Sequence, residues 1–259
     1  MPAVDYAANT PRWVDLGTSD LEAAKRFYSN LFGWTYESMS MEEAGGYTIF
    51  HKDGKSVCGG GPLMMEGQPT AWSTYVYVDD LDATAARVAE NGGTMLVQPM
   101  DVMDVGRMAV LMDPQGAVVS AWQPKAHRGA DLFNEPGTLT WNELASRDIE
   151  GSKRFYGAVF GWEGNTSEYG PSTYTEFKAN GATVAGMREM TPQEPADMPP
   201  HWLPYFAVAD TDATVDKARK GGAGVLMEPT TLPPGRMAVV ADPQGAVFAV
   251  IAMAAGDHA

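Results

Sequence analysis

Residues 20–34 read DLEAAKRFYSNLFGW and residues 148–162 read DIEGSKRFYGAVFGW, so one pattern occurs twice in the 259-residue chain. In each copy an Asp precedes apolar residues at helical spacing, and a Gly follows them. An Asp side chain caps the first turn of a helix, and a Gly in the left-handed conformation ends one. Each stretch therefore predicts an amphipathic helix with defined ends.

The similarity between the two halves extends well beyond this helix. WVDL at 13–16 matches WNEL at 141–144, GRMAV recurs at 106–110 and 235–239, and DPQGA recurs at 113–117 and 242–246. The spacing between copies drifts by a residue along the chain, as short changes in loop length would cause. We therefore predict a tandem duplication, with domains at 1–123 and 137–259 and a polar linker at 124–136.

Each half also repeats one pattern of elements internally. Alternating residues predict strands at 13–17, 34–39, 47–51 and 57–60, with the helix of 20–34 after the first. The order then recurs, with a strand at 73–78, a helix at 81–91 capped by Asp80, and strands at 94–97, 107–112 and 117–122. The sequence thus predicts an α+β protein built from four βαβββ modules.

Composition restricts the class of partner. The net charge is −15, from 33 acidic and 18 basic residues, whereas phosphate backbones are bound by clustered Lys and Arg. We expect no nucleic-acid partner, and we interpret the charge mainly as a solvated surface. The chain shows no apolar run of membrane-spanning length, no basic leader and a single Cys, so we expect a cytoplasmic protein with no membrane partner.

Three stretches resemble the vicinal oxygen chelate superfamily, which includes glyoxalase I, bleomycin-resistance proteins and extradiol dioxygenases. They are 20–34, VDDLD at 78–82 and DPQG at 113–116, each with a counterpart in the second half. The resemblance implies tandem glyoxalase-like domains whose curved mixed sheets enclose concave clefts. The chain also resembles the subset of this superfamily in which two such domains are fused, and this predicts a monomer or weak dimer.

Metal-dependent members of that superfamily place ligands at three positions per domain, and the resemblance carries these to six positions here. They are Trp13, Ser73 and Ser120 in the first half and Trp141, Leu203 and Ala249 in the second. None offers the imidazole or carboxylate that such metals require, and neither does a neighbour one residue away. We therefore predict no metal and no other cofactor.

Two carboxylates are candidates for acid–base chemistry. Asp15 lies two residues after Trp13 and Glu143 two after Trp141, so in a strand each shares a face with its Trp. An enclosed carboxylate could act as a general acid or base. The alternative is a structural carboxylate paired with Arg107 or Arg236. A register joining Ala109 to Ser120 would place Arg107 opposite Trp122 on this face.

Aromatic residues predict a binding surface on the same face. Tyr75, Tyr77 and Tyr205 follow the second ligand position at strand spacing, and rings of this kind suit a planar or cationic organic ligand. Filling the space that a metal occupies in relatives is the alternative. The predicted ligand-binding set is Trp13, Tyr75, Tyr77, Arg107, Ser120, Trp122, Trp141, Tyr205 and Arg236.

Three functions remain open at this point. The first is a metal-free protein that sequesters an organic small molecule, as in resistance. The second is a metal-independent hydratase, isomerase or hydrolase that uses Asp15 or Glu143. The third is a metal-dependent lyase or dioxygenase, which the six substituted positions disfavour.

Overall fold

A computed structural model describes residues 7–40, 44–64, 67–169 and 172–254. The predicted α+β architecture of tandem glyoxalase domains is confirmed: the strands form two eight-stranded mixed sheets, one from each repeat. Their strand orders are β2-β3-β4-β1-β5-β8-β7-β6 and β10-β11-β12-β9-β13-β16-β15-β14. Among the described residues, no helix has the length and apolarity needed to cross a bilayer.

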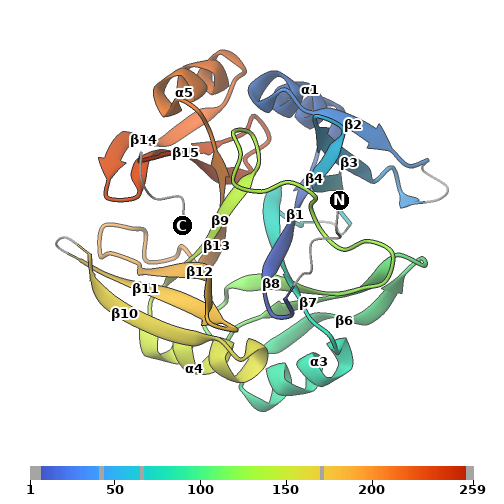
Figure 1. Cartoon of the computed structure of the whole chain (residues 1–259), viewed down its shortest axis with the longest axis vertical. Helices are drawn as coiled ribbons and strands as arrows, with labels where there is room; N and C mark the ends of the chain where they lie inside the picture. Colours follow the sequence, from blue (N-terminus) through green and yellow to red (C-terminus); the bar gives the residue numbers. More distant parts are fainter. Residues whose placement is uncertain (1–6, 41–43, 65–66, 170–171, 255–259) are drawn as a thin grey trace. The chain divides into compact units, whose positions relative to one another are not determined.

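The first repeat contains two helices and eight strands within its described residues (Figure 1). They are β1 (Pro11–Thr18), α1 (Leu21–Phe32), β2 (Thr35–Ser38), β3 (Thr48–Lys52), β4 (Lys55–Pro62), β5 (Ala71–Tyr77), α3 (Leu81–Glu90), β6 (Thr94–Val102), β7 (Gly106–Met112) and β8 (Val118–Pro124). The second repeat follows the same order. Its elements are β9 (Leu139–Ser146), α4 (Ile149–Phe160), β10 (Glu163–Tyr169), β11 (Ser172–Ala179), β12 (Ala182–Glu189), β13 (His201–Ala207), α5 (Thr211–Lys220), β14 (Gly224–Leu232), β15 (Gly235–Ala241) and β16 (Val247–Met253).

The two stretches that opened the sequence form α1 and α4 with the predicted ends. Asp20 accepts a hydrogen bond from the backbone N–H of Ala23, and Asp148 does the same for Gly151. Gly33 and Gly161 follow the helices at φ of 74° and 69°, the left-handed conformation that ends a helix at little cost for Gly.

The chain packs as two compact units, and each unit takes one module from each repeat. The first unit comprises the described residues up to Arg12, Ser73–Arg128 and Trp141–Leu203. The second comprises Trp13–Trp72, Gly129–Thr140 and the described residues from Pro204 onward. Helix α3 therefore packs with α4 in the first unit, and α1 packs with α5 in the second.

A buried tyrosine joins sheet and helix in each unit. In the second unit the Tyr28 hydroxyl donates to Asp242 Oδ2 at 3.0 Å and accepts from Trp72 Nε1 at 3.0 Å. The first unit repeats the arrangement with Tyr156, Asp113 and Trp202. Burial raises the pKa of both tyrosines well above the ordinary value, so each stays a neutral phenol within a satisfied polar network.

The predicted linker is partly built into the second unit. Residues 125–138 contain no helix or strand, yet Ala130 and Leu132 are buried, and Leu132 belongs to the apolar core of that unit. Residues 1–6 and 255–259 of the predicted domains lie outside the described residues. The division of the chain into repeats at 1–123 and 137–259 with a linker at 124–136 stays a prediction.

Candidate functional site

Alternation along β1 and β9 separates a helix-facing side from the side where we expect ligands. Val14 and Leu16 are buried in the core that contains α1, so Trp13 and Asp15 project from the other face of β1. In β9, Leu144 belongs to the core that contains α4, so Trp141 and Glu143 project from the opposite face. Each Trp and its carboxylate therefore share a face, as the sequence predicted.

In the second unit these two residues form a hydrogen-bonded triad with Tyr47, which directly precedes β3. The Tyr47 hydroxyl donates to Asp15 Oδ1 at 2.6 Å, and Trp13 Nε1 lies 2.5 Å from the same oxygen. Trp13 Nε1 also lies 3.2 Å from the Tyr47 hydroxyl. An indole and a phenol thus hold one carboxylate oxygen from two sides, which fixes the orientation of all three groups.

A glycine makes room for this triad. Gly59 of β4 is the partner of Asp15 in the parallel pairing of β1 with β4. A Cβ at this position would lie 2.6 Å from Tyr47 Cζ and would overlap both the tyrosine hydroxyl and the Asp15 carboxylate. Only Gly therefore lets the phenol lie flat against the strand and reach the carboxylate.

The first unit contains a second triad with the same composition. The Tyr174 hydroxyl, on β11, donates to Glu143 Oε2 at 2.9 Å and accepts from Trp141 Nε1 at 2.9 Å. Gly186 of β12 pairs with Glu143, and a Cβ there would lie 2.7 Å from Trp141 Nε1. Here the tyrosine hydroxyl links the indole and the carboxylate.

The second triad carries a cation. Arg188 Nε of β12 lies 3.5 Å from Glu143 Oε1, and the same guanidinium donates to both carboxylate oxygens of Glu194, at 2.9 and 2.7 Å. The Arg188 guanidinium holds the pKa of Glu194 down, from 4.5 to about 2. The position of Arg188 corresponds to Gly61 in the first repeat, so the two triads differ in local charge.

The loop at 190–200 is tied to the second triad through Glu194. Besides its bond to Arg188, Glu194 accepts from the backbone N–H of Thr191 at 2.7 Å. Arg147, just before α4, donates to the carbonyls of Pro195 and Met198 at 2.7 and 3.1 Å. Arg188 and Arg147 therefore both hold this Pro-rich connector by hydrogen bonds.

The predicted tyrosines and their strand partners also lie on faces turned away from the helix cores. Tyr75 pairs with Ser120 and Tyr77 with Trp122 across the parallel strands β5 and β8, and Tyr205 pairs with Ala249 across β13 and β16. Their strand neighbours, including Val76, Ala121, Phe206 and Val250, belong to the apolar cores. Ser73 and Leu203 precede Tyr75 and Tyr205 by two residues and share their faces.

Trp122 is engaged in structural contacts. Its Nε1 donates to the His127 carbonyl at 2.9 Å, and its ring stands edge-on to the His127 imidazole. Gly106 leaves the space that the indole fills, since a Cβ there would lie 2.6 Å from Trp122 Cε2. This tryptophan therefore holds the start of the connection between the repeats, and its N–H group is engaged in that contact.

The predicted hairpin register is wrong by one residue. Val110 pairs with Ser120 and Met108 with Trp122, so Arg107 falls opposite Gln123 on the helix side of the sheet. There Arg107 donates to both carboxylate oxygens of Asp82, at 2.6 and 3.1 Å. Arg236 makes the equivalent contact with Asp212 in the second unit. These arginines thus brace the starts of α3 and α5, and the cation beside Glu143 is Arg188.

The donor set does not fit the metal that the family resemblance implies. The six inferred positions offer indole, hydroxyl and alkyl groups, which are not the ligands of zinc, iron or manganese. Across the part of the chain that the structure describes, no three His, Cys, Asp or Glu side chains gather into a group that could hold a metal. Each described triad contributes one carboxylate.

The family is established by the sequence match over both repeats. A model of the Glyoxalase/Bleomycin resistance protein/Dioxygenase superfamily matches residues 10–120 and 138–250, and the chain belongs to this superfamily. It is 43% identical to "Putative glyoxylase CFP32" of Mycobacterium bovis over 95% of this chain and 96% of that protein. It is 37% identical to "Anthracycline biosynthesis protein DauV" of Streptomyces sp. (strain C5) over 95% and 94% of the two chains.

A solved structure shows the same fold at low sequence identity. The Mn(II)-bound glyoxalase from Novosphingobium aromaticivorans aligns with a TM-score of 0.62 and 17% identity, over 95% of this chain and 82% of that one. This likeness concerns the fold.

Sequence reasoning missed the two tyrosines, the two glycines and Arg188. A signal for four of them was present, because YTIF at 47–50 and YTEF at 174–177 match, and each is followed by a Gly twelve residues after its Tyr. Arg188 had no such signal, since its counterpart is Gly61. A comparison of the two repeats does not reveal a functional residue that occurs in only one of them.

Proposed function

We propose that this chain binds a planar organic small molecule, without a resident metal, on the sheet faces that carry the two triads. The observation that carries the proposal is the hydrogen-bonded Trp, carboxylate and Tyr on this face in both repeats, with the Trp at a position where the resemblance implies a metal ligand. Indole and phenol rings suit a flat ligand, and the polar edges of the triad supply orientation. The name of DauV places that relative in anthracycline biosynthesis.

Titration with 1,4-dihydroxyanthraquinone, monitored by quenching of tryptophan fluorescence, tests this proposal. We expect saturable binding that EDTA leaves unchanged, and metal analysis of the purified protein should find less than one zinc, nickel, iron or manganese ion per chain. Trp13→Phe and Trp141→Phe should weaken binding about fivefold or more, since each reduces the aromatic surface and removes an N–H donor. Tyr36→Phe, at an exposed position, is the control.

Stoichiometric metal whose removal abolishes binding would overturn the proposal. So would a quench that is the same in both tryptophan variants and in the control. We further propose that the chain acts as a monomer or weak dimer, because two fused repeats supply internally the pairing of single-domain relatives.

A metal-independent enzyme is the second candidate, and the contact between Tyr47 and Asp15 favours it. A carboxylate that a phenol and an indole hold in place can take a proton from a bound ligand and return it to the product, while the phenol stays neutral. Glu143 and Tyr174 offer the same chemistry at 2.9 Å. Asp15→Asn and Glu143→Gln separate the two functions: retained affinity with abolished turnover supports an enzyme, whereas no turnover of any bound ligand by the native chain supports a binding protein.

A further inference from the structure

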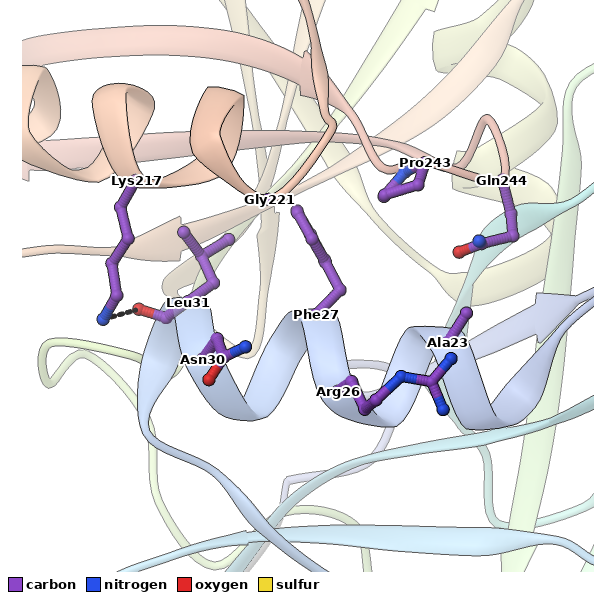
Figure 2. Close-up of a pocket in the computed structure, with 9 residues that line it drawn as sticks. All are labelled: Ala23, Arg26, Phe27, Asn30, Leu31, Lys217, Gly221, Pro243 and Gln244. Atoms are coloured by element: carbon purple, nitrogen blue, oxygen red, sulfur yellow. Dashed lines mark hydrogen bonds between the residues drawn. The ribbon is translucent and has the colours of Figure 1, made fainter.

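A hollow of about 350 Å³ lies in the second unit, on the side of β1 opposite to the first triad. One wall is α1, another is the end of α5, and the turn between β15 and β16 closes the third side (Figure 2). Phe27, Leu31 and Pro243 supply its apolar surface. Its volume lies at the lower end of the range for small-molecule sites.

The hollow carries positive charge in a chain whose net charge is −15. Arg26 and Lys217 line it, and none of its lining residues is acidic. Lys217 donates to the Leu31 carbonyl at 3.3 Å, which holds its ammonium group at one end, while Arg26 and Gln244 lie toward the other end (Figure 2). A local cationic surface of this kind attracts a small anion.

Gln244 contributes a buried acceptor with no partner. Its side-chain Oε1 is inaccessible to solvent and makes no hydrogen bond within the described residues. A buried carbonyl without a hydrogen bond is destabilising. A rotation of the Gln244 side chain into the hollow would bring this oxygen to the O–H or N–H group of a ligand, and that hydrogen bond would satisfy it.

The first unit contains the counterpart of this hollow, of about 300 Å³, with the same elements but different chemistry. There the Gln115 amide donates to Ser152 Oγ at 2.7 Å, and its Oε1 accepts from the backbone N–H of Asp148 at 2.8 Å. Asp148 also lines this hollow and offsets the charge of Arg154. In the second unit Ala24 replaces Ser152, which removes the acceptor of the glutamine NH₂ group. The backbone N–H groups of Ser19 and Asp20, which correspond to those that donate to Gln115 Oε1, donate to the hydroxyls of Thr70 and Thr18 and not to Gln244.

We infer that the hollow of the second unit binds a small hydroxylated organic acid. The carboxylate would lie between Arg26 and Lys217, the hydroxyl would donate to Gln244 Oε1, and the carbon skeleton would contact Phe27 and Pro243. The inference is independent of the function proposed for the triads, because it concerns the opposite face of the sheet and other residues.

Titration of the full chain with 4-hydroxybenzoate, followed by ¹⁵N–¹H NMR of the glutamine side-chain amides, tests this inference. We expect the Gln244 amide resonances to shift saturably while those of Gln115 stay in place. Benzoate lacks the hydroxyl and 4-hydroxybenzamide lacks the charge, so each should bind about fivefold more weakly or worse. Arg26→Gln should weaken binding by a similar factor, about 1 kcal/mol.

Arg154→Gln, at the matching position of the other hollow, is the control and should change the affinity less than twofold. Arg26 is exposed, so its replacement leaves the fold intact and the comparison stands. An unmoved Gln244 amide, equal affinity of the Arg26 variant and the native chain, or equal binding of benzoate and 4-hydroxybenzoate would each overturn the inference.

Discussion

Replacing Glu194 with Gln removes the carboxylate that holds the Arg188 guanidinium through two hydrogen bonds. The pKa of Glu194 falls from 4.5 to about 2 in the folded chain. At about 1.4 kcal/mol per pKa unit, this shift corresponds to about 3 kcal/mol of stability at neutral pH. The Glu194 side chain is 21% exposed and that of Arg188 33%, so solvent screening reduces the expectation to about 2 kcal/mol.

The pH dependence follows from the direction of the shift. Because the folded pKa lies below the unfolded value, the stabilisation is complete above about pH 4.5 and is lost as the pH falls toward 2. Urea unfolding of the native chain and of Glu194→Gln should therefore differ by about 2 kcal/mol at pH 7, and the difference should shrink steadily between pH 4.5 and pH 2. Glu168→Gln, on an exposed stretch of β10, is the control and should unfold like the native chain. A difference at pH 7 that persists unchanged at pH 2 would refute the electrostatic reasoning.

Two further predictions concern the buried tyrosines and the glycine beside the first triad. Tyr156→Phe should lower the free energy of unfolding by about 1–3 kcal/mol in urea, because Asp113 loses a donor and Trp202 Nε1 loses its acceptor; Tyr36→Phe, where the ring is exposed, should have no measurable effect. Gly59→Ala should displace Tyr47 and shift the Trp13 indole N–H resonance, whereas Gly61→Ala on the same strand, whose Cβ would meet Tyr47 Cδ2 at an ordinary 3.5 Å, should leave it in place. An unchanged indole resonance in the Gly59 variant would show that the triad tolerates a methyl group.

Helix ends and strand faces could be predicted because local chemistry determines them. An Asp followed by amphipathic spacing and a Gly specifies a helix whatever packs against it, which is why α1 and α4 begin and end where expected. Alternation likewise placed Trp13 with Asp15, and Trp141 with Glu143. The hairpin register failed because the Asp113 N–H bonds to the Ala117 carbonyl, and the intervening Gly116 takes a φ of 103°. This turn holds one residue more than the register that joins Ala109 to Ser120 assumes.

The pairing of modules from different repeats could not be predicted from the chain alone. An amphipathic helix shows which of its faces is apolar, but two nearly identical sheet halves offer equivalent apolar surfaces. Helix α1 contributes Tyr28 to a network that closes on Asp242, more than 200 residues later in the chain. The same bond in the other unit joins Tyr156 to Asp113. A sequence pattern that is satisfied equally well by either partner cannot indicate which partner is used.

Comparison of the two repeats separates packing from chemistry. The buried Tyr–Trp–Asp networks are the same in both units, because a change in any member would leave a buried polar group unsatisfied. Two differences concern the sites: the half-exposed Arg188 aligns with Gly61, and the buried Ser152 aligns with Ala24. The first difference gives one triad a cation where the other has a Gly, and the second removes the hydroxyl that accepts from the glutamine NH₂ group in one hollow. The proposed ligand sites of the two repeats can therefore differ in chemistry while the buried networks stay the same.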